Sequence, residues 1–173
     1  MKTKILLISL LFSILSCKKE YNLPLLNQEV LFQIEYTNRA WGYQHRGLMI
    51  DSTGMVWNYN LPKDWKFVDP DGFISYEDMK ANFSKLEMTS MTINNNTLRK
   101  YSSKLTRAAY GELSEPKTEM FDAGSTSYSG FIYNPETKKY KEVLIKQMGD
   151  VYIENKSAEA REIYNWLVRL KLE

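Results

Sequence analysis

The chain has 173 residues, of which 43% are hydrophobic and 25% charged, and these values are typical of a globular protein. Its single cysteine excludes an intramolecular disulfide framework, and its single histidine excludes zinc motifs built from histidine pairs. A chain of this length commonly forms one domain, and its composition indicates no specific enzyme activity.

The first sixteen residues have the pattern of an export signal. Lys2 and Lys4 provide a positively charged start, and residues 5–15 are apolar except for two serines. This run is too short for a permanent transmembrane helix, but it has the length of the hydrophobic region in a secretory signal peptide. Residues 1–16 are therefore predicted to be a signal peptide.

The four residues Ile14-Leu15-Ser16-Cys17 resemble the lipobox of bacterial lipoproteins. The resemblance implies cleavage just before Cys17, diacylation of its nucleophilic thiol, and acylation of the freed amine by a chain such as palmitate. Lys18 follows, whereas an Asp there resembles an inner-membrane retention signal, so the outer membrane is expected and either of its sides remains open. The whole chain resembles the small lipoproteins of the phylum Bacteroidota.

The remainder is predicted to be a lipidated tether, residues 17–28, followed by a single domain, residues 29–173. Pro24 and two asparagines interrupt any periodicity in the tether. Once the leader and its two lysines are removed, 21 basic and 21 acidic side chains remain. A nucleic-acid partner requires a basic surplus, so none is expected, and no fingerprint of a cofactor is present.

The mature chain is predicted to form strands first, then two helices, then further strands, and then a final helix. Alternating apolar residues and turn signals predict strands at residues 30–36, 43–51, 55–60, 117–122, 128–133, 139–147 and 151–154. Helical spacing and capping residues predict helices at about residues 75–87, at about 97–110, and after Ser157. This order predicts an α+β domain: an antiparallel sheet of about six or seven strands, covered on one face by about three helices, including a C-terminal helix.

One acidic segment in the middle of the chain resembles the centre of an EF-hand calcium loop. Asp69, Asp71 and Asp78 would be its ligands, but the first ligand position falls on Phe67, which has no oxygen in its side chain. A turn that leads into a helix capped by Ser75 accounts for the same residues. We favour the turn and keep calcium as the alternative.

Aromatic residues are concentrated between positions 41 and 65: Trp41, Tyr43, Trp57, Tyr59 and Trp65. Trp57 and Tyr59 alternate along a predicted strand and therefore share one of its faces. Trp41, Trp57 and Tyr59 are candidates for a face that stacks on sugar rings or on a partner protein. The alternative is that most of these rings fill the core, as large aromatic side chains do in small domains.

The chain shows no convincing catalytic set, so no catalytic residue is predicted. His45 lies within a predicted strand, and the stretch Ser125-Thr126-Ser127 is predicted to be a flexible loop without a nucleophile elbow. Paired carboxylates for glycoside hydrolysis remain open, because spatial pairs leave no mark in a sequence.

The leading hypothesis is a lipid-anchored envelope protein that is not an enzyme and that acts as a binding or structural accessory. Its expected partners are the membrane, through the lipid on Cys17, and an envelope protein or glycan. The alternative is a carbohydrate-binding or hydrolytic envelope protein that uses the aromatic face.

Overall fold

The computed structural model describes residues 28–170. The predicted signal peptide, Cys17 and almost all of the predicted tether lie outside the described residues. Within residues 28–170, none of the helices combines the length and apolar character needed to cross a membrane.

The domain is built on one antiparallel sheet. Its nine strands are β1 (Val30–Asn38), β2 (Gln44–Asp51), β3 (Met55–Asn60), β4 (Phe73–Ser75), β5 (Glu87–Thr92), β6 (Lys117–Thr118), β7 (Ser125–Asn134), β8 (Lys139–Gly149) and β9 (Val151–Glu154). Their order across the sheet is β5-β3-β2-β1-β7-β8-β9-β6, and β4 pairs with β8 outside this path. The β2–β3 hairpin closes at residues 51–54 as predicted, with Gly54 at a positive φ of 88°.

Three helices complete the described chain: α1 (Tyr76–Phe83), α2 (Asn95–Ala108) and α3 (Ala158–Leu167). Each begins at a capping side chain, Ser75, Asn94 or Ser157, that accepts a hydrogen bond from a backbone N–H of the first turn. Such caps satisfy donors that have no partner within a helix. The predicted α+β class with a C-terminal helix is confirmed.

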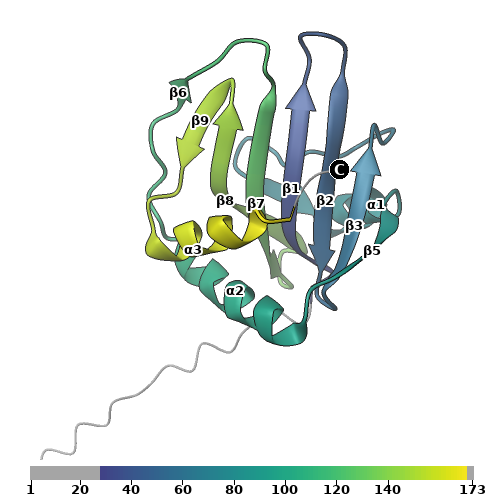
Figure 1. The fold of residues 1–173 in the computed structure, drawn as a ribbon. Coiled ribbons are helices and arrows are strands. Elements are labelled where there is room, and N and C mark those ends of the chain that lie inside the picture. The colour runs from purple at the N-terminus through teal and green to yellow at the C-terminus, as the bar shows by residue number, and fades with distance from the viewer. Residues whose placement is uncertain (1–27, 171–173) are drawn as a thin grey trace, which may run out of the picture.

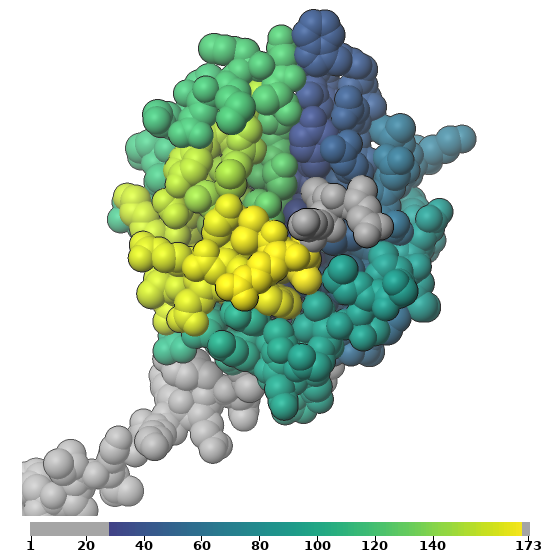
Figure 2. All heavy atoms as spheres, in the orientation of Figure 1, coloured from purple at the N-terminus to yellow at the C-terminus, as the bar shows by residue number. Residues whose placement is uncertain are grey.

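Helices α2 and α3 pack together on one face of the sheet (Figure 1). Leu48 and Ile50 point toward them from β2, and Trp166 of α3 stacks on Tyr101 of α2 with 4.4 Å between the ring centroids. In the space-filling view the two helices cover the lower part of this face, and strand residues form the surface above them (Figure 2). Part of the sheet face is therefore left without a helix.

Helix α1 lies on the opposite face, so the prediction that all helices cover one face is wrong. Met49 of β2 points away from α2 and α3 and packs in a second core with Tyr59, Phe131 and Met79 of α1. The physical reason is that the central strands are apolar on both faces, as the consecutive buried residues of β2 show. A sheet of that kind needs a cover on each side.

Several boundaries also differ from the predicted ones. The short strand β4 and the edge strand β5 were not predicted; β5 is mostly exposed and lacks a regular apolar alternation. Residues 125–127 are not a loop, because they pair with residues 35–37 of β1 and begin strand β7. Strand β6 covers two residues rather than 117–122, and α1 ends at Phe83 rather than near Glu87.

Candidate functional site

The calcium candidates Asp69 and Asp78 contribute hydrogen bonds to the turn and to the helix cap. Asp69 accepts hydrogen bonds from the backbone N–H groups of Asp71 and Phe73, at 3.0 and 2.8 Å. Asp78 accepts one from the Ser75 hydroxyl at 2.7 Å. Among residues 28–170 no group of three or more acidic, histidine or cysteine side chains could hold a metal ion.

The three aromatic residues predicted to form a ligand face do not share one exposed surface. Trp41 is 76% exposed, whereas Tyr59 is only 4% exposed and belongs to the core under α1. Trp57 packs edge-on against Phe83, and its indole N–H donates to Asp51 at 2.8 Å. The core interpretation therefore holds for Tyr59, whereas Trp57 is half-buried against α1.

His45 is the centre of a different aromatic cluster. Its buried ring is surrounded at centroid distances of 5.1 to 6.0 Å by four others: Tyr43, Tyr59, Trp65 and Phe67. Its Nε2 lies 2.7 Å from Oε1 of Glu35. Its Nδ1 is the one buried side-chain nitrogen or oxygen in residues 28–170 that has no hydrogen-bond partner. The ring is thus held by one carboxylate and by apolar contacts.

Glu35 also contacts polar side chains next to this cluster. Gln33 donates to the Tyr59 hydroxyl oxygen at 2.7 Å, and the Tyr59 hydroxyl in turn lies 3.4 Å from Glu35. Burial, reinforced by the Glu35 charge, raises the pKa of Tyr59 well above its usual value. Tyr59 is therefore a neutral phenol at any physiological pH and acts as a hydrogen-bonding core residue.

A second carboxylate, Glu142 of β8, lies near the first. Glu35 and Glu142 both line a cavity of about 30 Å³ beneath the segment 65–68. Ser129 donates to Glu142 at 2.6 Å, and burial together with the Glu35 charge raises the pKa of Glu142. The cavity holds about one water molecule and no sugar ring. Two carboxyl groups therefore line one cavity, but this cavity has no space for a sugar substrate.

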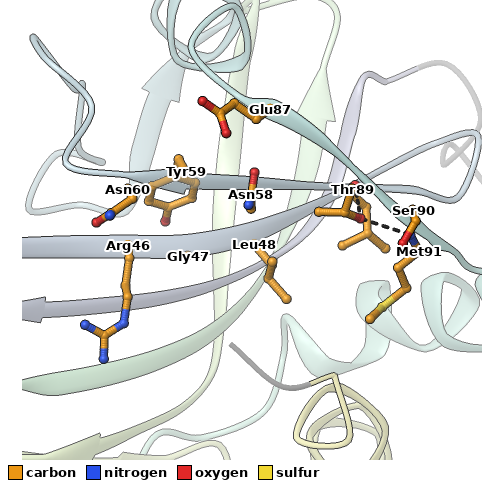
Figure 3. Close-up of a pocket in the computed structure, with 11 residues that line it drawn as sticks. Arg46, Gly47, Leu48, Asn58, Tyr59, Asn60, Glu87, Thr89, Ser90 and Met91 are labelled. Atoms are coloured by element: carbon orange, nitrogen blue, oxygen red, sulfur yellow. Dashed lines mark hydrogen bonds between the residues drawn. The ribbon is translucent and has the colours of Figure 1, made fainter. Parts of the chain in front are cut away.

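A larger, open pocket lies where the sheet face has no helix. It has a volume of about 360 Å³ and is lined by residues of β2, β3 and β5: Arg46, Gly47, Leu48, Val56, Asn58, Tyr59, Asn60, Glu87, Thr89, Ser90 and Met91 (Figure 3). This volume falls in the range of small-molecule sites, which run from about 300 to 1,000 Å³.

The wall of the pocket is a bulge in the edge strand. The register between β3 and β5 shifts between Met55 and Trp57. At that place the Thr89 hydroxyl donates to the carbonyl oxygen of Val56 at 2.7 Å and accepts the backbone N–H of Met91 at 3.1 Å. Residues 89–91 therefore leave the plane of the sheet and form a side to the pocket, as bulges commonly do next to binding sites.

The polar side chains on the floor and rim of the pocket have unused hydrogen-bonding groups. In the described part of the chain, the side chains of Asn58, Asn60 and Glu87 make no hydrogen bond or ion pair. Arg46 lies with its guanidinium 4.4 Å from the ring centroid of Tyr36 and has one long contact of 3.4 Å with Gln44. All of them project from regular strands, which hold them in defined positions.

The alternation of Asn58 and Asn60 with Trp57 and Tyr59 was visible in the sequence, but the aromatic residues attracted the functional interpretation. The pocket itself was not visible in the sequence, because strand β5 supplies its wall and this strand was not predicted.

Comparisons with protein-family models, with curated proteins and with solved structures found no match.

Proposed function

We propose that this protein is a lipid-anchored protein of the cell envelope whose domain binds a small polar ligand and catalyses no reaction. The anchoring part is supported by the export pattern of residues 1–16 and by the position of the single cysteine, Cys17, directly after it. Two or three acyl chains on this residue would hold the domain at a membrane, whereas one chain binds only marginally. The outer membrane is the proposed location.

The open pocket supports the binding part of the proposal. Asn58, Asn60 and Glu87 lie together at this concavity, where their exposed side chains are open to a ligand as well as to water. Amides and a carboxylate beside an apolar wall are the groups that recognise polar organic molecules such as sugars or peptides. The observation that carries the proposal is this set of free polar groups on rigid strands.

Hydrolysis is the second candidate, and the shared cavity of Glu35 and Glu142 is the observation that favours it. A raised pKa of one carboxyl beside a second carboxylate is the arrangement that general acid catalysis uses. The cavity of about 30 Å³ would have to open before a sugar could enter. Binding at the open pocket requires no such rearrangement and is therefore the primary proposal.

The anchor is tested by labelling cells with radioactive palmitate. The wild-type protein and a Ser13→Ala control should carry the label and sediment with membranes. Cys17→Ala should lose the label. If Cys17→Ala retains both the label and membrane association, or if mass spectrometry of the native protein shows an unmodified thiol, the anchor proposal is wrong.

The pocket is tested by calorimetric titration of the purified acylated protein, in detergent, with short peptides and with oligosaccharides. Ser90→Trp places an indole in the pocket, and Thr118→Trp adds the same group to an exposed position on β6 as a control. We expect at least one class of compound to bind the wild type and the control, and to bind Ser90→Trp at least about tenfold more weakly. Equal binding by Ser90→Trp, or binding of neither class, would overturn the proposal.

A further inference from the structure

His45 is a buried titratable residue that the proposed function does not use. Its side chain has no exposed surface, and its Nε2 lies 2.7 Å from a carboxylate oxygen of Glu35. This contact places the single proton of a neutral imidazole on Nε2, which donates it to Glu35. Nδ1 then carries only a lone pair, and it has no hydrogen-bond partner within residues 28–170. A second proton on the ring would therefore create a buried N–H group without an acceptor.

The ring is covered by residues 61–69, a segment that forms neither helix nor strand. Trp65 and Phe67 of this segment each lie with their ring centroid 5.2 Å from that of His45. Phe67 is 45% exposed, and Tyr43, which also contacts His45, is 47% exposed. A single layer of side chains thus separates the imidazole from solvent on this side.

The covering segment is held at few points. In the described chain its backbone-to-backbone hydrogen bonds lie only at its two ends, residues 61 and 69. Between them, the Asn82 side chain bonds the N–H and the carbonyl of Lys66, at 2.9 and 2.6 Å. Leu61 and Asp64 have positive φ angles of 48° and 53°, which side chains adopt at an energetic cost. Segments with few backbone hydrogen bonds are those that open locally.

Glu35 and His45 project from the paired strands β1 and β2, so their contact does not require the covering segment. The attraction between the carboxylate and a protonated ring is therefore the same in the covered and the uncovered arrangement. The arrangements differ at Nδ1, which gains water only when the segment moves away. Water stabilises the N–H of a charged imidazolium more than the lone pair of a neutral imidazole.

One interaction acts in the opposite direction. A protonated ring is attracted to the faces of the aromatic rings of Trp65 and Phe67, and this attraction favours the covered arrangement. A buried, charged donor without an acceptor costs more than such a contact returns. Protonation of His45 should therefore favour the uncovered arrangement.

The other titratable and charged groups near the ring lie on several elements. The Tyr59 hydroxyl of β3 is neutral, and Glu142 of β8 lines the same cavity as Glu35. Arg46 lies on the other face of β2, over the Tyr36 ring, and Arg39 lies 5.6 Å from the ring centroid of Tyr43. The charged residues of the covering segment are all exposed: Lys63, Asp64, Lys66 and Asp69. Because burial raises the pKa of Glu142, this carboxyl group is the one that a test must separate from His45.

We propose that protonation of His45 releases the segment 61–69 and opens the cavity that Glu35 and Glu142 line. Residues 65–68 form one side of this cavity, so their displacement admits solvent to both carboxyl groups. The device is a pH-dependent cover on the face of the sheet that carries α1. It requires neither the lipid anchor nor a ligand in the open pocket, and its test is therefore independent of the proposed function.

The test measures hydrogen exchange of the Lys66 amide by NMR spectroscopy of the acylated protein in detergent, at about pH 5.5 and about pH 8, on either side of the usual titration of imidazole. Each rate is divided by that of an unfolded peptide at the same pH, which removes the intrinsic pH dependence of exchange. We expect the protection of Lys66 to be at least about tenfold lower at the acidic pH. The Ser84 amide, which donates to Lys80 at the end of α1, is the internal reference and should change little.

Two variants assign the effect to a residue. His45→Gln retains a donor toward Glu35 but cannot be protonated, and it should abolish the pH dependence of Lys66 protection. Glu142→Gln removes the other candidate group and should retain that dependence. The proposal is overturned if Lys66 is equally or better protected at the acidic pH, or if Glu142→Gln abolishes the dependence and His45→Gln does not.

A measurement on the wild type provides the same assignment without a variant. His45 is the only histidine of the chain, so a single imidazole resonance reports its protonation. The loss of Lys66 protection should follow this resonance with the same midpoint. A different midpoint, or an imidazole resonance that does not titrate between the two pH values, would also overturn the proposal.

Discussion

The contact between Gly130 of β7 and Leu105 of α2 predicts a coupled effect on stability. A Cβ atom at position 130 would lie 2.3 Å from Cδ1 and 2.8 Å from Cδ2 of Leu105, whereas ordinary contacts run from 3.4 to 4 Å. Leu105 is fully buried between the sheet and α3, so its side chain has no solvent to move into. Gly130→Ala should therefore overpack the core and destabilise the protein by about 1–3 kcal/mol.

Leu105→Ala by itself should destabilise the protein by about 2–5 kcal/mol, because it removes a fully buried side chain and leaves a cavity. It also removes the two methyl groups that a Cβ at position 130 would meet. In the double variant the new methyl group enters the space that Leu105 vacates. The two effects should therefore fall short of additivity by about 1 kcal/mol or more.

The assay is urea unfolding followed by far-UV circular dichroism for the wild type, both single variants and the double variant. Equal slopes against urea establish that the midpoints report stability. Leu113→Ala, at a largely exposed leucine, is the matched control and should cost less than about 1 kcal/mol. Additivity within about 0.5 kcal/mol, or a Gly130→Ala variant as stable as the wild type, would refute the packing argument.

Three further predictions concern polar groups. Because burial raises the pKa of Glu142, its contribution to stability is full below its ordinary pKa of 4.5 and is lost as the pH rises through the higher pKa of the folded state. Above about pH 4.5, the urea midpoint should therefore fall less steeply with pH for Glu142→Gln than for the wild type. An identical dependence of the two midpoints on pH would contradict this prediction. Asn155→Ala should cost about 2 kcal/mol or more, since the buried Asn155 amide donates to the carbonyls of Ala108 and Leu144; thermal unfolding checks it, and a loss below about 0.5 kcal/mol would be the contrary result. Ser75→Ala should cost about 1 kcal/mol and speed hydrogen exchange in α1 alone, because it removes the cap on the Asp78 N–H; unchanged exchange would count against the cap.

Several elements of the domain were predictable because their signals are local. The β2–β3 hairpin follows from alternation on either side of the 51–54 turn, and helix α3 follows from its cap at Ser157 and its apolar spacing. The boundary between α1 and β5 was not predictable, because residues Ser84 to Thr92 contain neither proline nor glycine and show no clear helix or strand periodicity. The edge strand gains its structure from backbone pairing with β3, which leaves no pattern in its side chains.

The candidate sites depend on contacts between distant parts of the chain. The sequence predicted that His45 lies within a strand, and it does: His45 is buried on one side of β2, and its neighbour Arg46 is exposed on the other. It did not predict that Glu35 would meet His45, or that Glu87 would lie across β3 from Arg46.

Local sequence was sufficient for the α+β class and most strand positions, and it is the sole basis of the proposed leader and of the proposed lipidation at Cys17, because charge, periodicity and capping act over a few residues. Tertiary structure alone decided the order of strands, the placement of α1 on the far face and the open pocket. These depend on which apolar faces are buried together and on backbone pairing between residues far apart in the chain, and neither is encoded in any short window.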